Sequence, residues 1–326
     1  MKVLFIAKGN DDPATRYRVM PVLSRLHQLK IETGLCDDSD GIKGKLRLLC
    51  LAKDAQLLFI QRKLFTPWFI RLLKSRCNNI VFDFDDAIFC RSNGEVSASR
   101  MRKFKGMLGS STLVFAGNEY LAEQCTSVET LVVPTSVDEA RYSRNVEKES
   151  GCVLVWIGSS STRKYLEHHR SVLEEVGDRF PNVSLKVIAD FDFHLVNMKV
   201  SNVPWSIESE ASQLASAHIG IAPMIDNPWT NGKCALKIVQ YMAAGLPVIS
   251  SRIGANREVV VPGETGLLAD TVDEWMLAVE SLAGNQGERD RMGLAGYNRM
   301  SQKYSQEVVL DSIIGNLTAR QLIPAD

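Results

Sequence analysis

The first 133 residues alternate between short apolar runs and stretches whose apolar positions recur every three or four residues. Continuous apolar runs are typical of strands buried in a parallel sheet, and the wider spacing is typical of amphipathic helices. The strands expected are Val3–Ala7, Ile31–Cys36, Ala55–Gln61, Ile80–Phe84, Thr112–Ala116 and Thr130–Val133. The helices expected between them cover residues 16–30, 43–52, 67–76 and 119–125. This repeated order predicts a doubly wound parallel sheet.

The same alternation starts again after Val137–Gly151, a polar stretch without apolar periodicity that we interpret as a linker. The strands expected there are Val153–Ile157, Ser184–Ala189, His218–Ala222 and Leu246–Ser250, and the helices cover residues 165–180, 208–217, 272–283, 289–303 and 306–319. A chain of 326 residues also suits two domains. We therefore predict two Rossmann-like α/β domains, residues 1–145 and 152–326. The last helix could pack against the first domain.

The composition is that of a globular protein, with 45% hydrophobic and 23% charged residues and no net charge. No window approaches the 18 apolar residues of a membrane span, and the apolar start is too short for a signal peptide. The seven cysteines form an odd set without a C-x-x-C pair, which argues against a zinc site or a disulfide framework. These features favour a cytoplasmic location.

The charge is unevenly divided between the two halves. Residues 1–150 hold 23 Lys and Arg against 18 Asp and Glu, and the remainder hold 15 against 20. A basic first half suits an anionic partner, such as a bilayer surface or a lipid-phosphate acceptor, although this excess is also within ordinary scatter. The basic run at residues 100–105 could meet lipid headgroups, but such a run is more often a solvated helix face. Nothing indicates nucleic acid as a partner.

The stretch from Asn227 to Gly266 carries the most specific pattern. We expect a helix over residues 232–244 that ends at Gly245, since the residue after a helix often needs a positive φ. Lys233 and Lys237 are four apart and would share one face of that helix. Cations at a helix start oppose the dipole, so they favour an anion there, and a phosphate is the first candidate. The alternative is a solvated amphipathic helix with ordinary lysines.

This stretch resembles the donor-binding signature of family-4 glycosyltransferases, in the branch that carries GKC-x-x-K-x-x-QYMA-x-G-x-PV. The resemblance implies a GT-B fold, with two Rossmann-like domains facing across a cleft, and retaining transfer from a nucleotide-diphosphate sugar. The wider family has two Glu eight residues apart, and Gly232 and Gln240 stand at those positions here. Gln240 can still donate to ribose hydroxyls, whereas Gly232 has no side chain to hold a sugar.

The turn WIGSSST, residues 156–162, follows a predicted strand and opens a helix. Its hydroxyls can bind a diphosphate, or they can serve only as a helix N-cap. A second turn around Gly254 matches a family turn that contacts the donor, and the alternative there is a loop brace. The donor-side residues implied by the resemblance are Gly158, Ser159, Ser160, Ser161, Lys164, Lys233, Lys237, Gln240, Gly254, Asn256 and Glu258.

The motif FDFDDAIF places Asp83, Asp85 and Asp86 at the end of a strand, where such sheets line their ligand crevice. The motif resembles one of the same branch, and we expect Asp85 and Asp86 to orient or deprotonate the acceptor, while Asp83 packs structurally. The alternatives are a helix cap, or the D-x-D metal motif of GT-A enzymes. Three further residues, Gly9, Arg16 and Arg18, are expected on the acceptor or phosphate side.

The expected function is therefore a metal-independent hexosyltransferase of cell-surface polysaccharide synthesis, with Asp85, Asp86 and Lys233 as its catalytic residues. It would use a nucleotide-sugar co-substrate and no cofactor, act on a glycan or lipid-linked acceptor, and touch the membrane peripherally through its basic half. The five histidines show no ligand spacing, which argues against hydrolase chemistry. An inactive sugar-nucleotide-binding protein and a sugar-nucleotide epimerase on the same fold remain alternatives.

Overall fold

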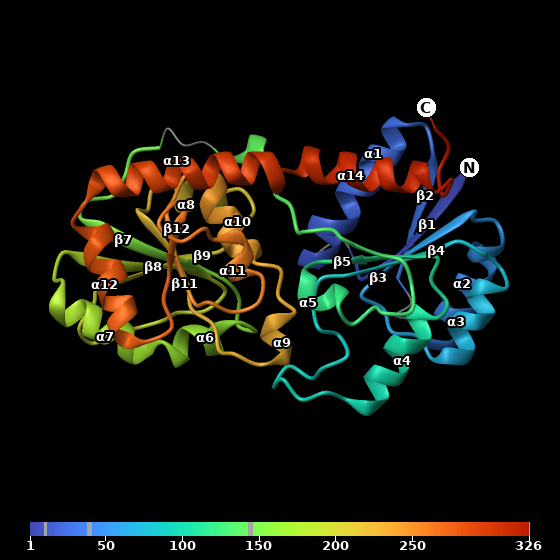
Figure 1. Cartoon of the computed structure of the whole chain (residues 1–326), viewed down its shortest axis with the longest axis horizontal. Helices are drawn as coiled ribbons and strands as arrows, with labels where there is room; N and C mark the ends of the chain where they lie inside the picture. The colour runs from blue at the N-terminus through green and yellow to red at the C-terminus, as the bar shows by residue number, and fades with distance from the viewer. Residues whose placement is uncertain (10–11, 38–40, 143–145, 326) are drawn as a thin grey trace. The chain divides into compact units, whose positions relative to one another are not determined.

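The computed structural model describes residues 1–9, 12–37, 41–142 and 146–325, and it divides into two compact units (Figure 1). The N-terminal unit consists of Met1–Ser136, Asn227–Cys234 and Gln306–Asp326, and the C-terminal unit of Val137–Asp226 and Ala235–Ser305. The start of the 227–266 stretch therefore belongs to the N-terminal unit. Among the described residues, no helix combines the length and apolarity that a membrane crossing requires.

The N-terminal unit is built on a sheet of six parallel strands in the order β2-β1-β3-β4-β5-β6. These strands are β1 (Lys2–Ile6), β2 (Glu32–Cys36), β3 (Leu57–Gln61), β4 (Ile80–Phe84), β5 (Leu113–Ala116) and β6 (Thr130–Val132). The helices are the π-helix η1 (Thr15–Val19), α1 (Met20–Gln28), α2 (Gly41–Lys53), α3 (Pro67–Lys74), α4 (Ala98–Leu108), α5 (Glu119–Ala122), α9 (Pro228–Asn231) and α14 (Gln306–Ala319).

Two helical layers cover this sheet (Figure 1). Alternate residues of a strand point to opposite faces, so Phe82 and Phe84 of β4 meet α2, α3 and α4 in one apolar core. Val81 faces the other way, into a second core with α1 and α14. Because α14 supplies Val309, Leu310 and other buried side chains to that second core, the last helix packs in the N-terminal unit.

The C-terminal unit holds a second sheet of six parallel strands, in the order β12-β11-β10-β7-β8-β9. These strands are β7 (Cys152–Ile157), β8 (Val183–Ala189), β9 (Val200–Pro204), β10 (Ile219–Ala222), β11 (Val248–Ser250) and β12 (Gly266–Leu268). The helices are the 3-10 turn η2 (Glu139–Arg141), α6 (Arg163–His168), α7 (Arg170–Arg179), α8 (Glu210–Ala215), α10 (Leu236–Ala243), α11 (Asn256–Val259), α12 (Val272–Ala283) and α13 (Gln286–Lys303).

Each sheet reverses its winding direction at one place, between β1 and β3 in the first and between β7 and β10 in the second. Ligands of doubly wound sheets bind outside the carboxyl ends of the strands at this reversal. In the N-terminal unit these ends lead to the residues after Ile6 and Gln61, and in the C-terminal unit to those after Ile157 and Ala222.

Several sequence expectations differ from the structure. The helix expected over residues 232–244 is wrong: the chain forms α9, then an open segment, and α10 begins only at Leu236, where Ala235 before it has a φ of 54°. Lys233 therefore lies outside the helix that carries Lys237. Gly245 does end α10, with a φ of 72°. The short strands β9 (VSNVP) and β12 (GLL) were not expected, because neither contains a continuous apolar run of the usual length.

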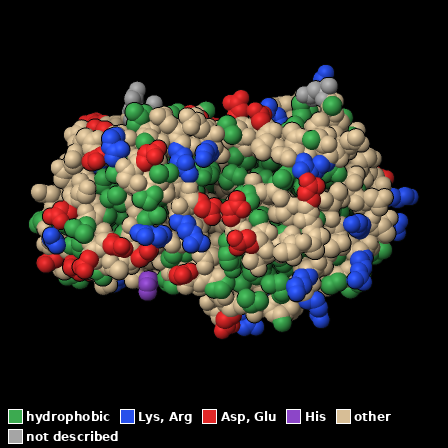
Figure 2. All heavy atoms as spheres, in the orientation of Figure 1, with side chains coloured by type: hydrophobic (Ala, Val, Ile, Leu, Met, Phe, Trp, Pro, Cys, Tyr) green, Lys and Arg blue, Asp and Glu red, His purple; other side chains and the backbone are tan. Residues whose placement is uncertain are grey.

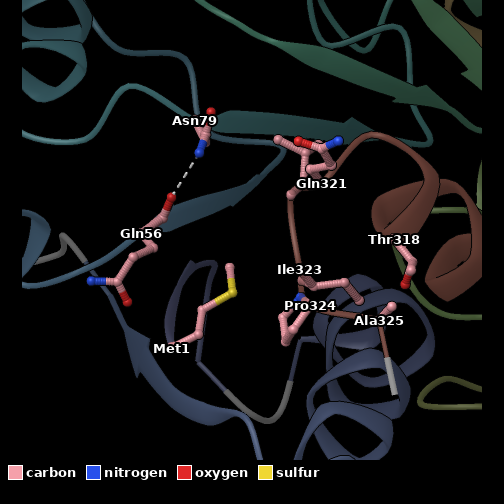
Figure 3. Close-up of a pocket in the computed structure, with 9 residues that line it drawn as sticks. Met1, Gln56, Asn79, Thr318, Gln321, Ile323, Pro324 and Ala325 are labelled. Carbon is pink, nitrogen blue, oxygen red and sulfur yellow. Dashed lines mark hydrogen bonds between the residues drawn. The ribbon is translucent and has the colours of Figure 1, made fainter.

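A cavity of about 640 Å³ lies in the N-terminal unit at the amino ends of the strands, beside the residues that precede β1, β3 and β4 (Figure 3). Its lining is Met1, Gln56, Asn79, Thr318, Gln321, Leu322, Ile323, Pro324 and Ala325. The Asn79 amide donates to the Gln56 carbonyl at 3.1 Å across it. The lining has no ionisable side chain, and the cavity lies at the amino ends of the strands, so we do not place the functional site there.

The buried His169 makes the stability of the fold depend on pH. It lies between α6 and α7, only 8% exposed, with its ring 4.1 Å from that of Trp275. Burial, with a smaller effect of the His168 charge, lowers its pKa to about 3. Half-buried His218 has its pKa lowered to about 4 in the same way. Protons therefore bind the unfolded chain more readily than the folded one at mildly acidic pH.

We predict that the free energy of unfolding falls as the pH drops from about 6.5 toward 4, because each such histidine removes about 1.4 kcal/mol per pH unit in that window. A His169→Phe variant should show a clearly shallower decline, with the remainder carried by His218. Urea unfolding at several pH values measures this. Equal pH slopes for the variant and the parent protein would contradict the role of His169.

Candidate functional site

Two strand ends of the N-terminal unit bring a guanidinium between two carboxylates. Arg62 follows β3 directly, and Asp85 and Asp86 follow β4. The Arg62 Nε donates to Asp85 Oδ1, and its Nη2 lies 2.8 Å from Asp86 Oδ2. Both aspartates are buried, at 7% and 5% exposure. One arginine thus fixes the orientation of both carboxylates that the sequence places on the acceptor side.

Arg62 is held there by an unusual backbone. Its φ is 55°, in the left-handed region that a residue with a Cβ rarely adopts, and its N–H donates to the Asp83 carbonyl at 2.8 Å. Non-glycine residues in this region cost about 1–3 kcal/mol and are concentrated at functional sites. The conformation continues the β3–β4 ladder for one residue and turns the side chain toward Asp85.

The third aspartate of the motif is part of the interior. Asp83, 2% exposed, accepts from Arg18 Nε at 2.9 Å and from its Nη2 at 2.5 Å. Arg18 also donates to the Val133 carbonyl at 2.9 Å, and it lies in the π-helix η1, a geometry that often marks functional segments. Asp83 therefore packs structurally, in agreement with the interpretation of the motif.

The positive charges keep Asp85 ionised. Burial alone would raise the pKa of its carboxyl group, but the guanidinium charges of Arg62 and Arg18 and the hydrogen bond from Arg62 lower it below its ordinary value. For Arg62, burial alone would lower the pKa, and the charges of Asp85 and Asp86 raise it above the usual range. At neutral pH the cluster therefore holds fixed charges of both signs.

The segment Asn227–Cys234 packs onto this cluster. Lys233 Nζ lies 2.7 Å from Asp86 Oδ1, and the Cys234 thiol donates to the Asp85 carbonyl at 3.3 Å. The Asn118 amide donates to the Asn231 and Lys233 carbonyls at 3.0 Å each. Burial raises the pKa of the Cys234 thiol well above its usual range, so it remains protonated.

Gly232 lies against the backbone of the N-terminal unit in this packing. A Cβ at this position would meet the backbone nitrogen of Ala87 at 2.5 Å, so no larger residue fits without movement of the backbone. The absence of a Glu at this family position thus has a physical reason in this structure, since the chain here rests against the residue that follows Asp86.

The structure places the other residues expected on the acceptor side as follows. Arg18 is 5% exposed and pairs with Asp83 and the Val133 carbonyl, so its observed partners lie within the protein. Arg16 is half-buried, and Gly9 is exposed. Asp85 and Asp86 are both buried and ion-paired, and their role toward an acceptor stays a prediction.

The alternative of a D-x-D metal motif gains no support from these contacts. Asp83 and Asp85 are each bonded to a different arginine, Arg18 and Arg62. In the described part of the chain, no group of three or more His, Cys, Asp or Glu side chains is arranged to hold a metal ion. Cations on the protein itself thus neutralise these carboxylates.

In the C-terminal unit, the turn after β7 forms the candidate donor site at the reversal of that sheet. Gly158 lies against Thr162, and a Cβ there would meet Thr162 Oγ1 at 2.7 Å. The Ser159 N–H donates to Thr162 Oγ1 at 3.1 Å, and the Ser159 and Ser161 hydroxyls lie 2.9 Å apart. The serines and Thr162 thus build a compact hydroxyl-rich turn at the start of α6.

A carboxylate and two lysines border this turn. The Ser160 N–H donates to Asp190 Oδ1 at 2.6 Å. Lys237, from α10, lies with its Nζ 3.5 Å from Thr162 Oγ1 and 3.9 Å from the centre of the Trp156 ring. Lys164 lies over the ring of Tyr165 at 5.2 Å. Of the two signature lysines, Lys237 is the one that the fold brings to this turn.

Gln240 faces the interior, which differs from the expected ribose contact. It is 4% exposed, and its Nε2 donates to Glu210 Oε1 at 2.9 Å. The same Glu210 accepts from the Tyr142 hydroxyl at 3.0 Å and from the Trp205 ring nitrogen at 2.7 Å. Helix α10 turns the Gln240 side chain toward the buried Glu210, and its predicted contact with the donor stays a prediction.

The second turn, at the end of β11, combines an internal brace with an exposed carboxylate. Asn256 is 2% exposed and donates to the Ser250 hydroxyl at 2.9 Å, as the alternative of a loop brace required. Gly254 has a φ of 50° and lets the chain reverse before it. Glu258 is exposed, and Arg299 holds its carbonyl at 2.7 Å. Of these residues, Glu258 is the one whose side chain can reach a ligand.

Two residues of these clusters escaped the sequence reasoning. Arg62 had one signal, a charged residue directly after the strand LLFIQ at the sheet's reversal. Glu210 had none, because a lone Glu at the start of a helix is ordinary.

Comparisons of sequence with known proteins match parts of the chain to glycosyltransferases. Residues 140–285, less than half of the chain, match the family model described as glycosyl transferases group 1. Over 76 residues the chain is 36% identical to D-inositol 3-phosphate glycosyltransferase of Corynebacterium diphtheriae, which is 23% of this chain and 18% of that protein. Over 95 residues it is 30% identical to alpha-1,3/1,6-mannosyltransferase alg-2 of Neurospora crassa, 28% of this chain and 17% of that one. The matches span under a fifth of these curated relatives.

Solved structures show the fold of the whole chain. Sucrose-phosphate synthase from Thermosynechococcus elongatus gives a TM-score of 0.77 at 15% identity, over 98% of both chains. Anabaena HepE in complex with UDP and glucose gives 0.74 at 14% identity, over 98% of this chain and 100% of that one. The trehalose-6-phosphate structure from E. coli, bound with UDP-2-fluoro glucose, gives 0.73 at 12% over both whole chains. The chain thus has the GT-B fold, and the predicted fold class is confirmed.

We predict that Gly232→Ala loosens the 227–234 segment from the N-terminal unit, because the added Cβ meets the Ala87 backbone at 2.5 Å. Overpacking of this kind typically costs about 1–3 kcal/mol. The matched control is Gly315→Ala in α14, where a Cβ meets nothing within 4 Å and should stabilise by up to about 1 kcal/mol. Denaturant unfolding measures both, and equal stability of the two variants would refute the close packing at Gly232.

Proposed function

We propose that this protein is a glycosyltransferase that moves a sugar from a UDP-sugar to a hydroxyl of a glycan or lipid-linked acceptor. The observation that carries the proposal is the turn after β7, where Lys237 Nζ lies beside Thr162 and Trp156 at the sheet's reversal. A hydroxyl-rich turn with a cation beside it suits a diphosphate. The GT-B fold and the group 1 family match over residues 140–285 support this reading, and UDP is favoured because HepE binds it.

In this proposal the C-terminal unit binds the nucleotide. Lys237 and the hydroxyls of the turn would stabilise the charge that builds on the diphosphate as the sugar leaves. Lys233 remains a second proposed phosphate contact, since 28% of its side chain is exposed, but the diphosphate would have to replace Asp86 as its partner. Lys164 and Glu258 are the further side chains proposed to contact the donor.

The N-terminal unit would bind the acceptor. Asp85 and Asp86 are proposed to orient its hydroxyl or accept its proton, and the guanidinium of Arg62 would hold them in place. A carboxylate with a lowered pKa is a weak base, so Asp85 suits orientation better than proton transfer. Asp86, which pairs with both Arg62 and Lys233, is the other carboxylate proposed to act on the acceptor hydroxyl.

Retention of configuration, a hexosyl donor and a role in cell-surface polysaccharide synthesis are parts of the proposal that rest on the sequence resemblance. The cytoplasmic location, the lack of a cofactor and the independence from metal are also parts of the proposal. Independence from metal fits carboxylates that are already paired with arginine. One observation favours an inactive, sugar-nucleotide-binding protein: Gly232 and the buried Gln240 leave the two family carboxylate positions without a group that faces a sugar. An epimerase would need carboxylates near the sugar, and the same observation disfavours it.

Transfer by the purified protein decides between these functions. UDP-sugars should be screened beside GDP-, ADP- and dTDP-sugars, first by thermal shift, where a ligand at 100 times its Kd stabilises by about 2.7 kcal/mol, and then for release of the nucleotide with and without acceptors. Binding of a UDP-sugar without turnover on any acceptor would favour the inactive binding protein.

The nucleotide site is tested by Lys237→Ala. We predict a roughly ten- to hundredfold weaker UDP affinity by calorimetry, because a hydrogen bond to a charged group contributes about 1.5–3 kcal/mol. Lys199→Ala, an exposed lysine of the same unit, is the control and should bind UDP as the parent protein does. An unchanged Kd in the Lys237 variant would remove that lysine from the proposed diphosphate site.

The acceptor side is tested by Asp86→Asn, which keeps the shape of the side chain and removes its charge. We predict that transfer falls by about 10²–10⁴-fold while the Kd for UDP stays within a few-fold, because such groups typically contribute that much to catalysis. The variant also weakens the pairs with Arg62 and Lys233, so its free energy of unfolding must be measured. A folded variant with the parent transfer rate would exclude Asp86 from the reaction.

A further inference from the structure

Helices α2, α3 and α4 of the N-terminal unit form a surface of one charge sign. Together they carry ten Lys and Arg, four in α2, two in α3 and four in α4, and no Asp or Glu. The whole chain has no net charge, so this excess is local. The cationic residues are Lys43, Lys45, Arg47, Lys53, Arg71, Lys74, Arg100, Arg102, Lys103 and Lys105.

Large apolar side chains project from the same helices. Ile42 is 79% exposed and Leu46 59% exposed in α2, and Trp68 is 60% exposed at the start of α3. An exposed tryptophan is uncommon, because its ring carries a large apolar area. Because these three side chains are exposed, the surface offers a partner apolar area in addition to charge.

In α2 the apolar and cationic positions are ordered. Ile42 and Leu46 are one turn apart on the solvent side, and Lys43 and Arg47 follow each of them by one residue. Gly44, Leu48 and Ala52 fill the opposite, buried side. The solvent side of this helix is thus apolar along its middle with cations beside it, which is the pattern of a helix that lies in a membrane interface.

The three helices lie side by side over one face of the sheet (Figure 1). Lys45 Nζ of α2 lies 5.7 Å from the centre of the Phe69 ring of α3. Pro67 of α3 is so close to Gly106 of α4 that a Cβ there would meet it at 3.2 Å. Figure 2 shows Lys and Arg side chains standing among hydrophobic ones along the margin where α3 and α4 lie. The features therefore form one continuous surface.

We propose that the α2–α3–α4 surface binds an anionic lipid bilayer, with Trp68, Ile42 and Leu46 in the interface and the surrounding cations at the headgroups. Charge complementarity selects anionic lipid, and the apolar side chains distinguish it from other partners. A protein interface is depleted of Lys at its centre. The exposed Ile42 and Leu46 do not fit a nucleic-acid-binding surface, because a protein's affinity for nucleic acid comes from phosphate contacts and base stacking.

The α2–α3–α4 surface reaches the end of the sheet at which the parallel strands terminate. Helices α2, α3 and α4 start after the carboxyl ends of β2, β3 and β4, so Ile42 and Trp68 lie near the edge that carries Arg62, Asp85 and Asp86. A membrane-bound acceptor would present its headgroup at this edge. This step rests on the proposed function and narrows its acceptor to a lipid-linked one, whereas lipid binding itself does not depend on sugar transfer.

Vesicle flotation of the full chain tests the proposal. Vesicles of phosphatidylcholine with phosphatidylserine should carry the protein, and vesicles of phosphatidylcholine alone should carry far less. The double variant Lys43→Ala with Arg47→Ala should lower the partition coefficient roughly 25-fold, since each cation near an anionic surface contributes about fivefold. Trp68→Ala should lower it about tenfold through lost apolar burial. Added salt should weaken binding of the parent protein.

Matched controls lie in the C-terminal unit. Lys199→Ala with Lys303→Ala removes two exposed cations, and Leu277→Ala removes a side chain that is 64% exposed. Both should float as the parent protein does, and all variants should retain its melting temperature and UDP affinity. Equal flotation of the α2 or Trp68 variants and the controls, equal binding to neutral vesicles, or binding to nucleic acid in place of vesicles would overturn the proposal. Because UDP binding is read separately, a failure here is distinguishable from a failure of the proposed transferase activity.

Discussion

The ion pairs of Arg62 with Asp85 and Asp86 are the interaction on which the candidate site at the carboxyl ends of the N-terminal strands depends. Together with Asp83, the two carboxylates place three negative charges within four residues, and all three are less than 10% exposed. Such a group folds only if cations are supplied in the interior, since removing one partner of a buried pair costs about 3–5 kcal/mol. Arg18 from η1 and Arg62, which follows β3, supply two of these cations. Arg62 makes both pairs from a strained backbone with a left-handed φ.

The third cation, Lys233, comes from a segment flanked on both sides by the C-terminal unit. Its pair with Asp86 therefore makes the charge balance of one unit depend on a loop within the sequence of the other. The glycine before Lys233 allows the close approach to Ala87, and the Cys234 thiol adds a hydrogen bond to the Asp85 carbonyl. If a diphosphate attracts Lys233, as proposed, Asp86 loses one of its two cationic partners.

The periodicity of the sequence was sufficient for the fold and insufficient for the contacts of the site. Apolar runs located ten of the twelve strands, and only the three-residue β12 and the half-exposed β9 escaped, because neither has a continuous apolar run. The signature lysines were expected on one helix, but Ala235 adopts a left-handed φ and separates them. Likewise, the family position of Gln240 indicated a ligand contact, whereas Glu210, distant in sequence, draws its side chain inward. Pairings of this kind follow from tertiary neighbours, which spacing within one element does not report.

The direction of the strands links the charged site to the lipid-binding surface proposed for the N-terminal unit. In a parallel sheet every strand ends at the same edge, and every following helix begins there. The residues after β3 and β4 therefore supply Arg62, Asp85 and Asp86, while the first turns of α2 and α3 supply Ile42 and Trp68 to the same edge. The covered face of these helices is fixed by the core around Phe82 and Phe84, so their exposed side has little freedom to turn elsewhere. A bilayer bound there would hold its headgroups at the level of the carboxylates. The fold would then fix the distance between a lipid-linked acceptor and these carboxylates.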